Sequence, residues 1–144
     1  MKLIFFGKGN RGVDCLRTLQ SLKYDVRLVV TQPEVGDEWY GSIEKLAESL
    51  DIPIFQPADP NATESIRTYQ AHEPDVFVLA GYGKILRQRV LTIPKLISIN
   101  LHAGKLPKYR GGSPLVWQIL NNEKKIGLSI IKINSLIDGG SLIS

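Results

Sequence analysis

The sequence predicts an α/β fold with an open, mainly parallel sheet and helices on both faces. Short apolar runs alternate along the chain with segments whose apolar residues recur at helical spacing. Residues 76–80 are apolar throughout, which is typical of a strand buried on both faces of a parallel sheet. The 144 residues show no repeat and no change of composition, so we expect a single domain over residues 1–144.

We expect strands where short apolar runs are bounded by glycine, proline or polar residues, at 2–6, 26–30, 52–55, 76–80, 97–101 and 126–133. Helices are expected where apolar residues lie three or four apart, at 13–22, 42–50, from 61 or 63 to about 71, 87–91 and 114–120. Ser42 is a candidate N-cap, and Pro114 stands at a first-turn position that suits proline. Residues 32–41 contain one proline and two glycines, which indicates a loop.

Composition narrows the class of protein. Charged residues make up 22% and apolar residues 43% of the chain, as in ordinary globular proteins. No apolar run approaches the roughly 18 residues of a membrane-spanning helix, and the apolar start is too short for a signal peptide. Cys15 is the only cysteine, which excludes a disulfide within the chain and fits a cytoplasmic location. The net charge of +4 favours an anionic substrate but is too weak to indicate nucleic-acid binding.

A glycine-rich turn, Gly7-Lys8-Gly9-Asn10-Arg11-Gly12, joins the first predicted strand to the first helix. Its G-x-G-x-x-G pattern leaves three interpretations open: a dinucleotide site, a site for the phosphate of an acceptor substrate, or a structural turn. A dinucleotide site also needs an acidic residue at the end of the second strand, but Gln32 and Pro33 stand there. We therefore favour binding of an acceptor's anionic group by Lys8, Gly9, Asn10 and Arg11.

Polar residues gather where the fifth predicted strand ends. Asn100 and His102 lie two residues apart, so they point to the same face of the sheet. Asp138 follows 36 residues after His102, in a turn at the mouth of the sheet. Each has an ordinary structural interpretation, as a hydrogen-bonded core residue or a turn-forming aspartate. Together, an amide, an imidazole and a carboxylate at one strand edge form a candidate site for acyl transfer.

These residues stand in a recognisable pattern. Asn100-x-His102, the segment Gly104-Lys105-Leu106-Pro107-x-Tyr109-Arg110-Gly111, and Asp138-x-Gly140 together resemble the formyltransferases that use 10-formyltetrahydrofolate. That family includes methionyl-tRNA formyltransferase, glycinamide ribonucleotide formyltransferase and sugar N-formyltransferases. The resemblance covers essentially the whole chain and implies a Rossmann-like formyltransferase fold. Family catalytic domains continue well beyond the aspartate, so we expect this chain to be truncated at its C-terminus.

The resemblance implies transfer of a formyl group from 10-formyltetrahydrofolate to a primary amine, without a metal. Asn100 and His102 would stabilise the oxyanion, and Asp138 would orient His102 and accept the proton of the attacking amine. Three short segments would contact the folate. They are Gly83, Lys84, Ile85 and Leu86; Gly104, Lys105, Leu106 and Pro107; and Ile137, Gly139 and Gly140. Ile85 and Leu86 have core packing as an alternative role.

Two departures from the family pattern bear on the acceptor. Gly104-Lys105 stands where Ser-Leu is usual in the tRNA and nucleotide enzymes, and the segment looks more like the sugar N-formyltransferases. Residues 31–41 carry Glu34, Asp37 and Glu38, and an acidic loop repels a phosphate backbone. We therefore expect an amino sugar on a nucleotide carrier as the acceptor, and neither nucleic acid nor a membrane as a partner.

Several alternatives stay open. The acceptor could be methionyl-tRNA or glycinamide ribonucleotide. The chain could instead be an NAD-binding module, or an inactive fragment of the formyltransferase fold. The sequence does not decide between a monomer and a homo-oligomer. Trp39 has two interpretations, stacking on a nucleotide base or local packing, whereas Trp117 is expected in the core.

Overall fold

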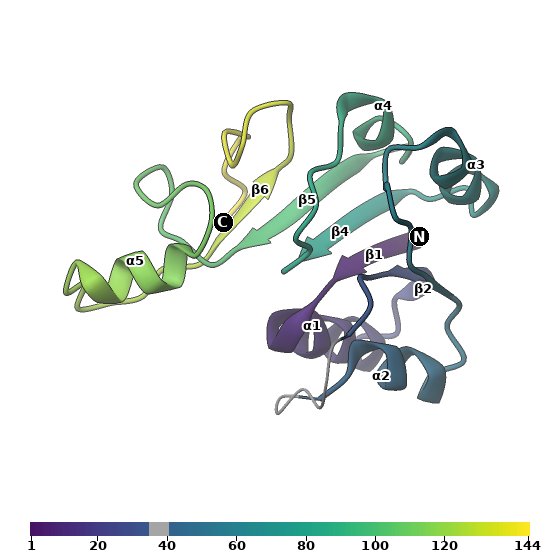
Figure 1. Ribbon diagram of the computed structural model, residues 1–144, viewed down its shortest axis with the longest axis horizontal. Coiled ribbons are helices and arrows are strands. Elements are labelled where there is room, and N and C mark those ends of the chain that lie inside the picture. The colour runs from purple at the N-terminus through teal and green to yellow at the C-terminus, as the bar shows by residue number, and fades with distance from the viewer. Residues whose placement is uncertain (35–40) are drawn as a thin grey trace.

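The computed structural model describes residues 1–34 and 41–144. They form one six-stranded sheet in the order β3-β2-β1-β4-β5-β6 (Figure 1). Strands β1 to β5 are parallel to their neighbours, and β6 runs antiparallel to β5. The predicted fold class is therefore confirmed. Residues 35–40, which include Asp37, Glu38 and Trp39, lie outside the described residues, so the predictions made for them are not addressed.

The elements follow the expected alternation of strands and helices. The strands are β1 (Lys2–Gly7), β2 (Asp25–Val30), β3 (Ile54–Phe55), β4 (Val76–Ala80), β5 (Ile97–His102) and β6 (Ser129–Lys132). The helices are α1 (Gly9–Ser21), α2 (Ile43–Ser49), α3 (Thr63–Ala71), α4 (Gln88–Leu91) and α5 (Pro114–Leu120). Ser42 caps α2, because its hydroxyl accepts a hydrogen bond from the amide of Lys45 at 3.0 Å.

Helix α1 and strand β6 differ most from the sequence prediction. Helix α1 begins at Gly9 rather than at residue 13, so most of the glycine-rich turn is its first turn. The apolar periodicity marks only where burial begins, at Gly12 and Val13, and misses the polar turn before it. Strand β6 covers four residues instead of the eight predicted, because β5 pairs with it only from Ile99 to His102.

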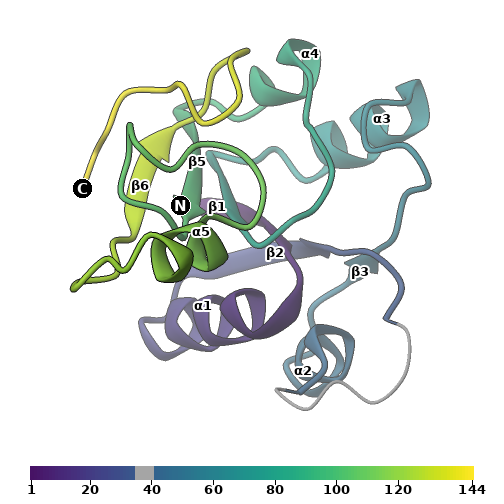
Figure 2. The ribbon, with the colours of Figure 1, turned by 60° about the vertical axis from the view of Figure 1, so that its left-hand side comes forward.

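Helices cover both faces of the sheet and divide the core in two. Helices α1 and α2 pack on one face against Leu3, Phe5 and other strand residues. Helices α3 and α4 pack on the opposite face, where Phe6 and Phe77 lie among the buried residues. Figure 2 shows the two helix pairs on opposite sides of the strands. The strand order reverses between β1 and β4, and such a switch point is where parallel sheets bind ligands.

Helix α5 stands apart from these layers, beyond the carboxyl end of β5 (Figure 1). Trp117 on this helix is 56% exposed, so the prediction that it packs in the core is wrong. The apolar residues of α5 follow helical spacing, but the buried residues of the helix are Pro114 and Gln118. The first-turn position of Pro114 predicted the helix correctly, but the sequence could not show that its apolar side is exposed.

Candidate active site

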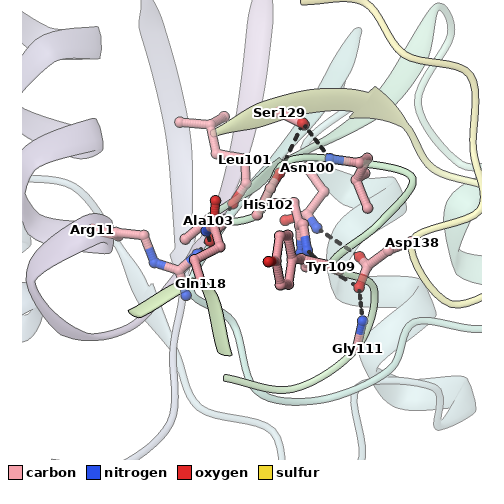
Figure 3. A network of polar contacts seen from close by, with 12 residues as sticks. Arg11, Asn100, Leu101, His102, Ala103, Tyr109, Gly111, Gln118, Ser129 and Asp138 are labelled. Atoms are coloured by element: carbon pink, nitrogen blue, oxygen red, sulfur yellow. Dashed lines mark hydrogen bonds and ion pairs between the residues drawn. The ribbon is translucent and has the colours of Figure 1, made fainter. Parts of the chain in front are cut away.

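Asn100, His102 and Asp138 converge at the carboxyl end of β5 (Figure 3). The Asn100 side chain donates from Nδ2 to Asp138 Oδ1 at 3.4 Å. His102 Nδ1 lies 3.4 Å from Asp138 Oδ2, and both side chains are largely buried. The amide and imidazole come from one strand, whereas the carboxylate comes from the loop after β6. The structure thus brings together the three residues that the sequence singled out.

The main chain of residues 109–111 holds two of these side chains. The amide of Gly111 donates to Asp138 Oδ2 at 2.9 Å. His102 Nε2 contacts the carbonyl oxygen of Tyr109, which fixes the plane of the imidazole ring. Sequence reasoning missed both contacts, because a main-chain donor or acceptor leaves no mark in the residue types.

Buried side chains anchor the loop that provides these contacts. Gln118 of α5 is fully buried and donates to the carbonyl oxygen of Ala103 at 3.0 Å. Its Oε1 accepts from the amide of Gly127 at 2.8 Å. Ser129 donates to the carbonyl oxygen of Gly104 at 2.8 Å and accepts from the amide of Leu106 at 3.2 Å. The sequence did carry one signal for this anchor. Gln118 is the single polar residue in an otherwise apolar helix, and a polar side chain in such a place needs hydrogen-bond partners if it is buried.

A cavity opens beside Asn100 and Asp138. Five residues predicted to contact folate line it, namely Gly83, Lys84, Ile85, Leu86 and Ile137. Its remaining lining comes from Leu79, Tyr82, Ile131, Ile133, Asn134, Ser135 and Leu136. Both Ile85 and Leu86 line the cavity, but core packing, their alternative role, applies to Leu86 alone, because Ile85 is 69% exposed. Residues 134–136 were not predicted, although they directly follow a strand whose end was expected to face the site.

The other predicted folate contacts lie elsewhere. Gly104, Lys105, Leu106, Pro107, Gly139 and Gly140 are absent from the lining of this cavity. Gly104 must be small, because a Cβ there would lie 2.6 Å from both His102 Nε2 and the Tyr109 carbonyl oxygen. Gly140 lies against the carbonyl group of Lys132, which leaves no room for a side chain. In the structure these glycines shape the loops around the catalytic candidates.

The predicted acceptor-binding residues Lys8, Gly9, Asn10 and Arg11 surround the start of α1 and do not line the cavity. Arg11 reaches toward the site, since its Nη1 lies 3.5 Å from the carbonyl oxygen of Leu101 (Figure 3). Partial burial lowers the pKa of the Arg11 guanidinium. Of these four residues, Arg11 is therefore the one that the structure connects to the end of β5.

The described residues hold no group of three or more His, Cys, Asp and Glu side chains that could bind a metal ion. Within the same part of the chain, no helix has the length and apolar character needed to cross a membrane.

Comparison with known proteins decides the family. A family model described as Formyl transferase matches residues 1–144. A methionyl-tRNA formyltransferase from Macrococcus caseolyticus (strain JCSC5402) is 39% identical over 147 residues, covering 99% of this chain and 47% of that protein. The chain belongs to the formyl transferase family. A second methionyl-tRNA formyltransferase, from Clostridioides difficile (strain 630), is 36% identical over 148 residues, covering 99% of this chain and 48% of that protein.

Solved structures show the same formyltransferase fold. A phosphoribosylglycinamide formyltransferase from Bacillus halodurans superposes with a TM-score of 0.80 at 22% identity, covering 100% of this chain and 77% of that one. The corresponding protein from Streptococcus pneumoniae TIGR4 gives a TM-score of 0.81 at 19% identity, covering 99% and 79%. This formyl transferase chain spans about half the length of the curated relatives it matches.

Proposed function

We propose that this chain performs the chemistry of a formyltransferase that moves a formyl group from 10-formyltetrahydrofolate to a primary amine. The observation that carries this proposal is the convergence of Asn100, His102 and Asp138 beside a cavity. An amide donor and a carboxylate acceptor at one point suit attack on a carbonyl group, which needs both oxyanion stabilisation and proton removal. Membership of the formyl transferase family supports the same reaction.

The cavity suits the folate co-substrate, which supplies an activated formyl group on N10. Apolar side chains such as Leu79, Leu86 and Ile131 offer surface to a flat heterocycle. Polar atoms of Asn134 and Ser135 line the same cavity and could fix the orientation of such a ring. If the formyl group lies beside Asn100 and Asp138, the rest of the folate would lie along residues 83–86.

In the proposed reaction, Asn100 stabilises the oxyanion that forms when the amine attacks the formyl carbon. One hydrogen of its Nδ2 points to Asp138, and the second is free to donate to the oxyanion. Asp138 accepts a proton from the attacking amine. As the intermediate collapses, the bond between the formyl carbon and N10 breaks, the proton passes to N10, and tetrahydrofolate leaves as the neutral secondary amine. The sequence resemblance implied that His102 also stabilises the oxyanion. Because an oxygen atom faces each of its ring nitrogens, we assign His102 instead to holding Asp138 and the 109–111 loop in place.

The comparisons support methionyl-tRNA as the acceptor better than the amino sugar expected from the sequence. The two curated relatives described above, at 36% and 39% identity, are both named for methionyl-tRNA. The likeness to glycinamide ribonucleotide enzymes is one of fold, at about one-fifth identity. We therefore rank the candidate acceptors as methionyl-tRNA first, then glycinamide ribonucleotide, then a nucleotide-linked amino sugar.

The test combines a binding measurement with an activity measurement. Binding of 5-formyltetrahydrofolate, a stable analogue, is followed by calorimetry, and formyl transfer is assayed with each of the three acceptors. We expect Asn100→Ala and Asp138→Ala to lower the transfer rate at least about a hundredfold, because oxyanion donors and general bases contribute that much. Folate binding should change little in either variant.

A matched control is Asp14→Ala, which removes an exposed carboxylate on α1, and it should leave both measurements unchanged. Near-normal transfer by Asn100→Ala or Asp138→Ala would refute the proposed roles. Failure of the parent chain to bind the folate analogue would refute the assignment of the cavity.

A further inference from the structure

Positive charge is concentrated in one part of the chain. Residues 103–137 contain six lysine and arginine residues and one glutamate, a net charge of +5, whereas the whole chain carries +4. This stretch includes the loop that holds His102 and Asp138, helix α5 and strand β6. A local excess of this kind attracts anionic groups of a ligand, although the net charge of the chain is modest.

A second cavity lies within this stretch, between the loop around residues 108–110 and helix α5. Its lining combines two cations, two aromatic rings, an amide and a proline: Lys108, Arg110, Tyr109, Trp117, Asn121 and Pro114. None of these residues lines the cavity beside Asn100. Cations beside an exposed aromatic ring are the groups that bind the phosphate and the base of a nucleotide.

Helical spacing places Trp117 on the cavity side of α5. Pro114, Trp117 and Asn121 are three and four residues apart, so they share one face of the helix. Leu115 and Ile119, two exposed apolar residues of the helix, lie on a different face. The Trp117 ring is 56% exposed and is therefore available for stacking on the side that the cations line.

Lys108 and Arg110 differ in whether a carboxylate neutralises their charge. Lys108 Nζ lies 2.6 Å from Glu123 Oε1, and this ion pair neutralises it. Arg110 is exposed, and among residues 1–34 and 41–144 no carboxylate lies within ion-pair distance of its guanidinium. Arg110 can therefore offer its full set of donors to a phosphate.

The second cavity is tied to the candidate active site through the chain. Arg110 directly precedes Gly111, whose amide binds Asp138. Tyr109 contributes its carbonyl oxygen to His102 and its side chain to the second cavity. A ligand held there would thus touch the same loop that orients His102 and Asp138, the residue proposed to accept a proton from the amine.

We propose that the second cavity binds the nucleotide part of the acceptor, with a phosphate on Arg110 and a base stacked on Trp117. This inference rests on the proposed function, because it places the part of the acceptor that is remote from the reacting amine. The same chemistry could come from the end of an RNA or from a free nucleotide that carries an amine. An acceptor with a phosphate but no base would gain only the Arg110 contact.

Direct binding tests this site without folate and without an amine, so its outcome is independent of whether transfer occurs. Adenosine monophosphate is titrated into the chain by calorimetry, with adenosine and ribose 5-phosphate as probes that lack one of the two groups. We expect Arg110→Ala and Trp117→Ala each to weaken binding of adenosine monophosphate about tenfold, because each removes one of the two contacts. Arg67→Ala, which removes an exposed cation on α3, is the matched control and should not alter binding.

Fluorescence locates the ligand, because the chain has two tryptophans and Trp39→Phe leaves Trp117 as the only one. In that variant, adenosine monophosphate should quench the emission and ribose 5-phosphate should not. A short ribo-oligonucleotide ending in adenosine is then compared with the mononucleotide. Tighter binding of the oligonucleotide assigns the site to an RNA end, and equal or weaker binding assigns it to a free nucleotide carrier.

Two results would overturn the proposal. One is an absence of detectable binding by adenosine monophosphate at millimolar concentration. The other is unchanged affinity in both Arg110→Ala and Trp117→Ala, with circular dichroism showing that the variants are folded.

Discussion

At the scale of single residues, His102 is held at both of its ring nitrogens. Oxygen atoms face both of its ring nitrogens, from Asp138 and from the Tyr109 carbonyl group. The sequence could predict that Asn100 and His102 share a face, since that follows from strand geometry alone. It could not predict the Tyr109 and Gly111 contacts, because these depend on the path of the main chain rather than on side-chain chemistry.

The glycine at position 104 provides a test of this arrangement. In Gly104→Ala the new methyl group would lie 2.6 Å from His102 Nε2, so the imidazole must move. We expect the rate of formyl transfer to fall at least about tenfold, because a shift of His102 would misplace Asp138, which it contacts. Gly112→Ala is a matched control, because a Cβ at residue 112 would meet nothing within 4 Å. Equal transfer rates in the two variants would show that His102 does not need its present position.

Cys15 gives a second test at this scale. Burial raises the pKa of its thiol from the ordinary value of 9.0 to about 11. Because the thiolate is the reactive form, iodoacetamide at pH 8 should alkylate the folded chain about a hundredfold more slowly than the urea-unfolded chain. Mass spectrometry of quenched samples measures both rates. Rapid alkylation of the folded chain would show that α1 does not pack against the core as described.

At the scale of elements, the apolar runs predicted the strands of the central sheet well. Strand β4 is the clearest case. Its five residues are all apolar and all buried, as is typical of a strand covered on both faces of a parallel sheet. The boundaries of α1 and β6 could not be predicted. The first is set by a polar turn, and the second by the part of β5, Ile99 to His102, that pairs with β6. The position of α5 depends on contacts of Gln118 with distant main-chain groups, which no local pattern encodes.

An ion pair joins the active-site loop to the end of α5 and predicts a pH dependence. Glu123 accepts hydrogen bonds from Lys108 Nζ and from the Tyr109 hydroxyl, both at 2.6 Å. The hydrogen bond from Lys108, and secondly that from Tyr109, lowers the pKa of Glu123 below its ordinary value of 4.5. Its contribution to stability is therefore complete above about pH 4.5 and is lost as the pH falls through the lower, folded-state pKa.

The measurement is the melting temperature between pH 7 and pH 3, for the parent chain and for Glu123→Gln. Glutamine cannot titrate, so the variant should lose less of its melting temperature on acidification. Glu48→Gln, at an exposed position on α2, serves as the control and should behave like the parent chain. Parallel curves for Glu123→Gln and the parent would show that this ion pair adds nothing to the stability of the loop.

At the scale of the whole molecule, the chemistry gathers at one end of the sheet. The end of β5, the loop after β6 and the loop around residues 83–86 meet there, although they are far apart in the sequence. The exposed apolar residues of α5 lie at the same end, in a chain that spans about half of its curated relatives. Parallel topology explains why the ends of β4 and β5 share one edge. The loop after β6 reaches the same place differently, because β6 runs antiparallel and the chain folds back after it, where Leu142 bridges Ile131.

The most direct test of the account is a crystal structure of the chain with 5-formyltetrahydrofolate bound. We predict that the ring system occupies the cavity lined by residues 83–86 and 134–138, with the free Nδ2 hydrogen of Asn100 directed toward the co-substrate's reacting end. The carboxylate of Asp138 should lie on the side from which an amine can approach. Electron density for the ligand outside this cavity, or a bound ligand that leaves Asn100 and Asp138 untouched, would contradict the account.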